Sequence, residues 1–341
     1  MRASRLVLPA IAVATVAMIF ASTSEGGRRS RRCRSACCYT QYDNCCDTPA
    51  NSCCCPNGEN ATTPPDNTGN TANNPPRVGG VHCLFIAGTA DVGVAGPVTN
   101  GTNAMVRLFT ETPGLKEKIR SRKTLSGADA TPENILQSCD EIKSTKEDTI
   151  FVFYHGHGGT KDGQHVLLPL LKRGADDKLP DGLDRALPRA KILEALTKKE
   201  FRFICLVSDA CSNKMQSSKS FAAGAAPSNV VPSVVSLMLD NKGILDVNSS
   251  TYDAAKDINE KAWVDNGGGL FTLAFVELGK GQVPDPDGNN QVSWKKEFLP
   301  ALATKTDNAF QNFRKTPRAL ASDPEILSQD HQTVQLFPHD S

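Results

Sequence analysis

Two short apolar runs, each closed by polar residues, constrain the fold of this chain more than any other feature. Thr149–Phe153 continues directly into Tyr154–Gly158, which reads Tyr-His-Gly-His-Gly, and Phe201–Val207 continues directly into Ser208–Cys211, which reads Ser-Asp-Ala-Cys. Short runs rich in Ile, Val and Phe are typical of buried strands. Because the carboxyl ends of parallel strands line the ligand crevice of an open sheet, we expect a His and a Cys to emerge there together. A nearby His can convert a thiol into the thiolate that acts as a nucleophile.

Beyond about residue 80, strand patterns alternate with helix patterns. This alternation predicts an α/β domain with a mainly parallel sheet and helices on both faces. The expected strands are 82–87, 119–125, 149–153, 165–168, 201–207 and 243–247, and the expected helices are 104–109, 131–142, 190–196, 270–278 and 294–299. A helix over Pro132 has the strongest start signal, because Thr131 can cap it and Pro suits its first position.

Length and charge limit the number of domains and the kinds of partner. The chain has 341 residues and a formal net charge of +1. That length suits one good-sized domain with additional segments. A nearly neutral chain gives no support for a nucleic-acid partner, so we expect none.

The N-terminus has the order of a secretory signal peptide, which we place over residues 1–24. Arg2 and Arg5 precede the apolar run Leu6–Ala21, and small residues follow it. The run is short for a membrane span, so we expect a secreted or cell-envelope protein. The alternative is a retained anchor with the domain in the cytoplasm, because the arginines at 28–34 favour the cytoplasmic side.

A cysteine-rich segment over residues 25–56 precedes the domain. It holds eight of the twelve cysteines of the chain. In an exported protein such a cluster predicts disulfides, and the alternatives are a metal site or thiol modification. Residues 57–79, which are rich in Asn, Thr and Pro, predict a solvated linker.

Six segments together resemble those of metacaspases and related bacterial caspase-like peptidases. Tyr154–Gly158 resembles their Tyr-Ser-Gly-His-Gly motif, and Ser208–Cys211 resembles their Asp-x-Cys motif. Four further segments flank these motifs and occur in the order of the family: Ala130–Leu136, His165–Pro169, Gly243–Ser250 and Gly268–Thr272. The resemblance implies a caspase-like peptidase domain over residues 80–305, followed by a C-terminal extension over residues 306–341.

The resemblance implies a cysteine-type endopeptidase with a Cys–His dyad. Cys211 would be the nucleophile, and His157 would be the general base and acid, because the family's catalytic His is flanked by Gly on both sides. The backbone N–H groups of Gly158 and Cys211 would form the oxyanion hole. No cofactor is required for this chemistry. Cys83, Cys139 and Cys205 lie inside apolar runs, so we expect these three to be buried structural thiols.

Substrate preference depends on the charge of the first pocket. Family members that cleave after Arg or Lys line this pocket with two carboxylates, and Asp209 matches one of them. Asn100 stands where the second would be. We therefore expect cleavage after Arg or Lys through a single acid, with a structural role for Asp209 as the alternative. Ser249 and Ser250 are candidate walls of the substrate groove, or equally the cap of a strand end.

Calcium has weak support. Some metacaspases use a regulatory calcium, and the acidic group Asp176, Asp177, Asp181 and Asp184 could hold one. A solvated acidic loop is the favoured interpretation. The Asp285–Asn289 segment lacks the turn Gly and the bidentate Glu of a calcium-binding loop, so we predict a turn there and no metal site.

Two functions compete with peptidase activity. The first is a caspase-fold binding or scaffold protein without turnover, which the replacement of the second pocket acid by Asn100 would suit. The second is a secreted cysteine-rich adhesion module, which accounts for the N-terminal segments alone. For the peptidase we expect a protein or peptide substrate and a monomer, with membrane contact only if residues 1–24 remain as an anchor.

Overall fold

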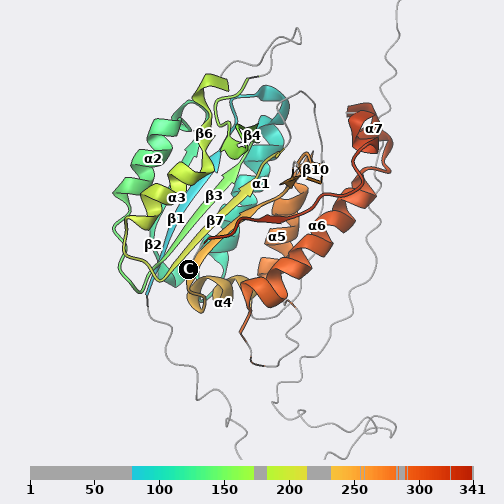
Figure 1. Cartoon of the computed structure of the whole chain (residues 1–341). Coiled ribbons are helices and arrows are strands. Elements are labelled where there is room, and N and C mark those ends of the chain that lie inside the picture. Colours follow the sequence, from blue (N-terminus) through green and yellow to red (C-terminus); the bar gives the residue numbers. More distant parts are fainter. Residues whose placement is uncertain are drawn as a thin grey trace, which may run out of the picture. The chain divides into compact units, whose positions relative to one another are not determined.

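The computed structural model describes residues 79–172, 183–212 and 232–339, apart from 254, 257, 282, 284–288, 290 and 323 (Figure 1). These residues belong to one compact unit, Thr68–Ser341. The predicted signal peptide and cysteine-rich segment lie outside the described residues, as do Asp176, Asp177 and Asp181. In the described part, no helix is long and apolar enough to cross a bilayer.

A six-stranded sheet forms the centre of the unit, in the order β13-β8-β7-β3-β1-β2. Five strands are parallel, and β13 pairs antiparallel with β8. The bounds are β1 Val81–Ala87, β2 Ile119–Ser126, β3 Thr149–His155, β7 Phe203–Asp209, β8 Gly243–Asn248 and β13 Gln335–Leu336. Every residue of β1, β3 and β7 is buried, which is why their sequences are continuous apolar runs. The predicted α/β class with a mainly parallel sheet is confirmed.

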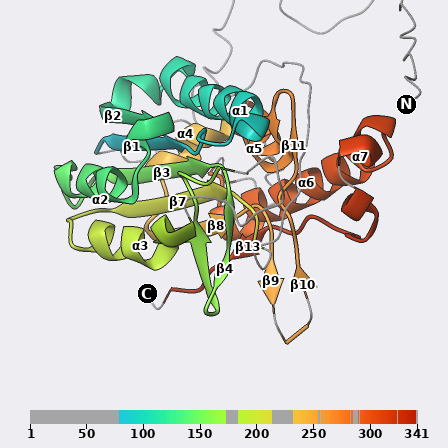
Figure 2. The same ribbon diagram turned by 90° about the horizontal axis from the view of Figure 1, so that it is seen from above.

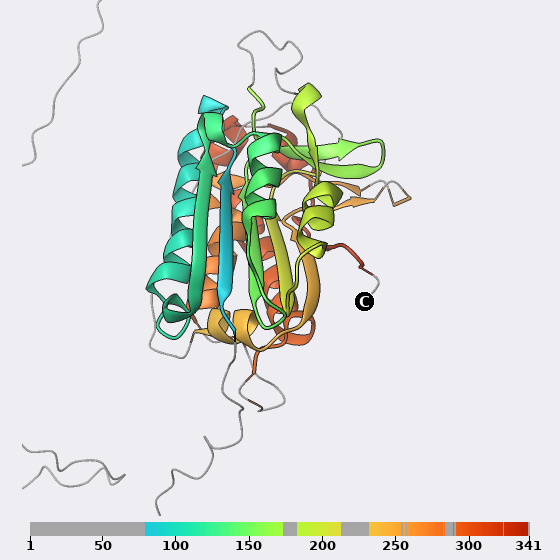
Figure 3. The same ribbon diagram turned by 90° about the vertical axis from the view of Figure 1, so that its left-hand side faces the viewer.

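Helices cover both faces of the sheet (Figure 3). On one face, Cys83 and Phe85 of β1 pack in a core with α1, α4, α5 and α6; on the other, Leu84 and Ile86 pack with α2 and α3. The alternation follows from the two-residue period of a strand. The helix bounds are α1 Val92–Glu111, α2 Pro132–Glu141, α3 Arg189–Thr197, α4 Ser233–Leu239, α5 Leu270–Lys280 and α6 Leu299–Phe313.

Helices α1 and α2 begin with side-chain caps. Thr131 caps α2 by accepting a hydrogen bond from the Asn134 N–H at 3.0 Å, with Pro132 at the first position, as predicted. Helix α1 is longer than its apolar part suggested, and it begins directly after Asp91, whose carboxylate accepts from the Gly93 N–H at 2.8 Å. This cap brings Asp91 to the carboxyl end of β1.

Small strands gather at the carboxyl end of the sheet. β4 Gly158–Lys161, β5 Gln164–Leu167 and β6 Leu187–Pro188 form one small sheet, β9 Tyr252–Asp253 pairs with β10 Ile258–Asn259, and β11 Val264–Asp265 pairs with β12 Gly268–Gly269. The β4–β5 and β9–β10 hairpins project toward the same side (Figures 2 and 3). These elements have two to four residues each, too few to produce a periodic sequence pattern.

The residues after position 305 complete the domain. The boundary predicted at 305 falls inside α6, which follows a π-helical turn, Trp294–Phe298. Helix α7 Pro317–Ser322 and the short helix Pro324–Leu327 come next, and β13 then returns to the edge of the sheet beside β8. The described residues between 306 and 339 therefore belong to the same folded unit.

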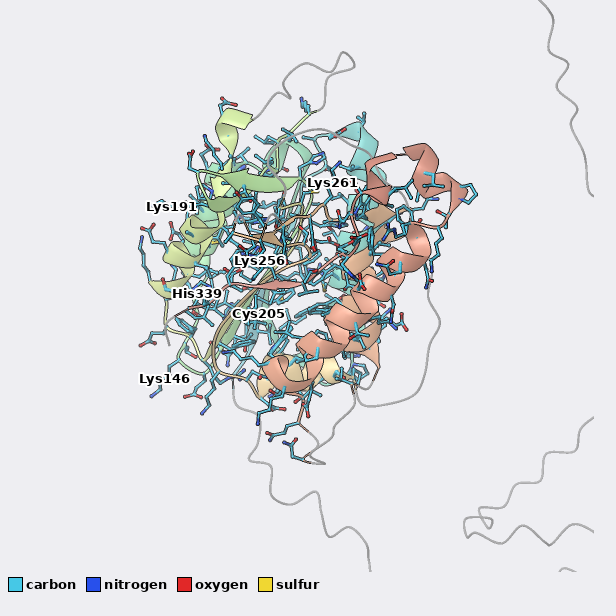
Figure 4. The ribbon with its side chains drawn as sticks, turned by 45° about the vertical axis from the view of Figure 1, so that its right-hand side comes forward. Lys146, Lys191, Cys205, Lys256, Lys261 and His339 are labelled. Carbon is cyan, nitrogen blue, oxygen red and sulfur yellow. The ribbon has the colours of Figure 1, made fainter. Side chains whose placement is uncertain are left out.

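A buried arginine ties α3 to the sheet. Arg189 is 3 % exposed, pairs with Asp246 of β8, and donates to the backbone carbonyls of Leu206 at 3.0 Å and Val247 at 2.7 Å. Its guanidinium also lies 5.1 Å from the ring centre of Phe337, just beyond β13. Lys191, two residues along α3, instead lies at the rim of the molecule (Figure 4).

We predict that Arg189→Met lowers the free energy of unfolding by about 3–5 kcal/mol, because it leaves the Asp246 carboxylate buried without its main partner. The matched control is Lys191→Met, which removes an exposed pair with Glu194 and should cost less than about 1 kcal/mol. Urea unfolding followed by circular dichroism measures both. Equal effects of the two substitutions would contradict this role for Arg189.

Candidate functional site

The register of β3 and β7 aligns the two motifs. His155 of β3 pairs with Asp209 of β7, and the Gly156 N–H then donates to the Asp209 carbonyl at 3.2 Å. His157 and Cys211 each follow two residues beyond that pair. His157 and Cys211 therefore follow the carboxyl ends of two neighbouring parallel strands, at the same end of the sheet.

The backbone of His157 is fixed from two sides. The Tyr154 hydroxyl donates to the His157 carbonyl at 2.6 Å, and the Leu168 N–H donates to the same oxygen at 2.9 Å. Burial raises the pKa of Tyr154, and the charge of Cys211 raises it further, so Tyr154 stays a neutral donor.

The ring of His157 is held by a carboxylate that the sequence analysis missed. His157 Nε2 lies 2.8 Å from Asp91 Oδ2, and the two side chains are 7 % and 6 % exposed. Asp91 comes from the N-terminus of α1, far from both motifs in the sequence. The available signal was an Asp shortly after the first strand, at a helix start, where capping residues occur.

Cys211 is the one cysteine of the four in the described residues that is not buried. Its Sγ lies 3.7 Å from the carbonyl oxygen of Ala262, and its own carbonyl accepts a hydrogen bond from His165 Nε2 at 3.1 Å. Burial, together with the charge of Arg189, lowers the pKa of His165 to about 3, so His165 is a neutral donor. The backbone of the candidate nucleophile is thus fixed by β5.

Gly158 is required by close packing. A Cβ at this position would lie 2.8 Å from the Ala210 Cβ and 2.8 Å from the Cys211 carbonyl oxygen. Any side chain here would push the ends of β3 and β7 apart. This close approach places the Gly158 backbone beside Cys211; its role in an oxyanion hole stays a prediction.

Ser249 and Ser250 support the strand end that precedes Cys211. Both are fully buried. Ser249 Oγ accepts from the Ala210 N–H at 3.1 Å, and Ser250 Oγ donates to the Ala210 carbonyl at 2.9 Å. The side-chain amide of Asn248 donates to the same carbonyl at 3.0 Å. Of the two roles considered for these serines, this placement favours the structural one.

Asp209 lies beneath the N-terminus of α5. Its Oδ2 accepts from the Thr272 N–H at 3.0 Å and from the Thr272 hydroxyl at 2.6 Å, and the residue is 2 % exposed. A Cβ at Gly269 would lie 1.8 Å from this oxygen, so only Gly leaves room for the carboxylate. Asp209 therefore stabilises the helix start through its orphan N–H groups.

His155 occupies the space next to Asp209. Its Nε2 lies 3.9 Å from Asp209 Oδ2, and the residue is fully buried. Gly101 of α1 faces the ring, since a Cβ there would lie 2.6 Å from His155 Cε1. Burial lowers the pKa of His155, with an opposing contribution from Asp209, so His155 is neutral around pH 7.

Asn100 is exposed on α1 and is separate from this pair. Its side-chain amide donates to the carbonyl of Asn266, in the turn between β11 and β12, at 2.7 Å. This bond attaches the hairpin to α1 at the position where the family would have its second pocket acid.

The remaining cysteines of the described residues are buried, as predicted. Burial raises the pKa of Cys139 to about 12 and raises the pKa of Cys83 and Cys205 well above the ordinary value. Figure 4 shows Cys205 in the interior of the sheet. Thiols of this kind do not form thiolates near pH 7.

In the described parts of the chain, no cluster of three or more His, Cys, Asp or Glu is arranged to hold a metal ion. Asp184 lies in a short helical turn, Leu183–Arg185, and the other three members of the acidic group lie outside the described residues. A calcium site at this acidic group therefore stays a hypothesis from the sequence.

The chain was compared with models of known protein families and with curated proteins, and neither comparison found a match.

We predict that iodoacetamide at pH 7.5 alkylates Cys211 in the native protein and leaves Cys83, Cys139 and Cys205 unmodified. The reason is that alkylation needs an accessible thiolate, which the three buried residues lack. Mass spectrometry of the peptides that contain the four residues measures the modification. Labelling of Cys83, Cys139 or Cys205 at the rate of Cys211 would contradict this view of the thiols.

Proposed function

We propose that this chain is a caspase-like cysteine endopeptidase with Cys211 as nucleophile and His157 as general base and acid. The observation that supports the proposal is the pairing of β3 with β7, since His157 and Cys211 follow the carboxyl ends of these two neighbouring parallel strands. Two contacts add support: the buried Asp91 carboxylate contacts the His157 ring, and the neutral His165 donates to the Cys211 carbonyl.

The chemistry follows from the nature of these groups. The proton of the Cys211 thiol moves to His157, and the thiolate sulfur attacks the carbonyl carbon of the scissile peptide. The developing oxyanion would accept hydrogen bonds from the Gly158 and Cys211 N–H groups. His157 then returns the proton to the departing amine, which leaves a thioester on Cys211. Water, deprotonated by His157, releases the acid and restores the thiol.

For the substrate, we propose cleavage after Arg or Lys, with Asp209 as the acid of the first pocket. Asp209 Oδ1 is buried and makes no hydrogen bond within the described residues, so one carboxylate oxygen is available for a cationic side chain. His155 Nε2 lies 3.9 Å from the other oxygen, Asp209 Oδ2, and the ring is neutral. A substrate cation would reach Asp209 only if the His155 side chain moves aside. The preference for Arg should therefore be weaker than in an open pocket with two acids.

For partners and location, we propose a monomer that acts on protein or peptide substrates outside the cytoplasm. Strand β13 covers the β8 edge of the sheet. The opposite edge strand, β2, exposes Arg120, Arg122 and Lys123, and charges of this kind oppose edge-to-edge pairing. Export rests on the N-terminal sequence alone.

We predict that Cys211→Ala reduces peptide hydrolysis to background and that His157→Ala lowers kcat/KM by roughly 10²–10⁴-fold, the usual contribution of a general base. The controls are Cys205→Ala, a buried thiol, and His331→Ala, an exposed His. Both should keep near-parental turnover of a fluorogenic Arg peptide. Full activity in Cys211→Ala would refute the nucleophile, and an inactive parent that binds the peptide would favour the scaffold function.

We predict a preference for Arg over Lys and no useful cleavage after Asp. His155→Ser should raise kcat/KM for Arg peptides roughly tenfold, since a charge-assisted hydrogen bond contributes about 1.5–3 kcal/mol. Asp209→Asn, which can still accept from Thr272, should remove the preference for Arg. A peptide library with the P1 residue varied measures all three proteins. Cleavage after Asp, or an unchanged preference in Asp209→Asn, would refute the pocket while leaving the Cys211–His157 pair intact.

A further inference from the structure

Asp91 links the start of α1 to the ring of His157. Its two carboxylate oxygens have separate partners: Oδ1 accepts from the Gly93 N–H at 2.8 Å, and Oδ2 lies 2.8 Å from His157 Nε2. The Asp91 carbonyl also accepts from the Ala95 N–H at 3.0 Å, in the first turn of the helix. The side chain is therefore held in one orientation by the helix that it caps.

We propose that Asp91 is a positioning residue, which fixes the ring orientation and tautomer of His157 and extends the pair into the chain Asp91–His157–Cys211. The inference rests on the proposed peptidase function and deepens it. It concerns a residue outside both sequence motifs.

The chemistry of the contact assigns the proton on the ring. A carboxylate oxygen is only an acceptor, so Nε2 must be the nitrogen that carries hydrogen in neutral His157. Nδ1 is then the unprotonated nitrogen, and it accepts the proton of the Cys211 thiol. In that step the S–H bond breaks with its electron pair left on sulfur, and an N–H bond forms at Nδ1.

The same contact stabilises the charge that this transfer creates. His157 becomes an imidazolium between a thiolate and a carboxylate, and Asp91 and His157 are both nearly excluded from water. In such surroundings an electrostatic interaction is stronger than at the surface. Asp91 thus favours the thiolate–imidazolium form over the neutral pair.

The other titratable groups near His157 in the described residues do not change their own charge around pH 7, so they would not produce the pH dependence expected of Asp91. They are Tyr154 and His155 on β3, His165 on β5, and Asp209 at the end of β7. Burial raises the pKa of Tyr154 and lowers the pKa values of His155 and His165, so all three remain neutral around pH 7. Asp209 is bound to Thr272.

The test uses two substitutions that retain the helix cap. Ser and Asn both cap helices well, so Asp91→Ser and Asp91→Asn keep a partner for the Gly93 N–H. Both substitutions remove the negative charge of the carboxylate that contacts the His157 ring. We expect kcat/KM for the Arg peptide to fall roughly 10²-fold. A control is Thr131→Ala, which removes the cap of a different helix, α2, and should lower Tm without altering kinetics.

The decisive readout is the pH profile. In a bell-shaped profile the acidic limb reports thiolate formation and the alkaline limb reports loss of the imidazolium proton. A nearby carboxylate favours the imidazolium, so its loss should move the alkaline limb down and the acidic limb up, each by about one unit. A purely structural role for Asp91 would lower activity without moving the limbs.

Alkylation of Cys211 separates this inference from the proposed function. The rate of carboxamidomethylation with iodoacetamide against pH reports the thiolate and needs no substrate. If the parent shows no peptidase activity but Asp91→Ser raises the pH at which Cys211 becomes reactive, the proposed function fails and the Asp91 inference stands. If both Asp91 variants keep the pH–activity limbs and the alkylation profile of the parent, the Asp91 inference is overturned.

Discussion

The parallel pairing of β3 with β7 is the constraint on which the candidate site depends. Both strands are buried on both faces, and a shift of register by one residue would exchange the side chains that face the two cores. In the observed alignment His155 opposes Asp209. His157 and Cys211 each lie two residues beyond this last pair, so both follow the carboxyl ends of the paired strands.

Around this pairing, neutral buried donors and acceptors hold the backbone of both strand ends. Tyr154 binds the His157 carbonyl, His165 binds the Cys211 carbonyl, and Ser249 and Ser250 bind Ala210. None of these groups brings a net charge, so they fix the geometry without competing for the proton. In the proposed mechanism, the charge beside His157 comes from Asp91.

Much of the fold was predictable from the sequence, because long buried strands and capped helices leave local patterns. The run Thr149–Phe153 and the Thr131 cap of α2 are examples. The small strands at the carboxyl end were not, since pairs such as Val264–Asp265 with Gly268–Gly269 are too short for a period. For the site, the pattern indicated which residues follow the strands. It could not indicate that Ser249 and Ser250 face the backbone, or that Asp91 meets His157, because those contacts join segments far apart in the chain.

Asp209 and Asp91 show why an acid near the proposed nucleophile cannot be assigned a role from its position in a motif. Asp209 lies two residues before Cys211, yet its Oδ2 is bound to Thr272 at the start of α5. Asp91 lies far away in sequence and also caps a helix, but its second oxygen is directed at the ring of His157. Each carboxylate has two oxygens, and in both cases one serves a helix terminus. The role of the other oxygen then depends on the side chain next to it. Beside Asp209 this is the neutral His155, and beside Asp91 it is His157, the proposed proton acceptor.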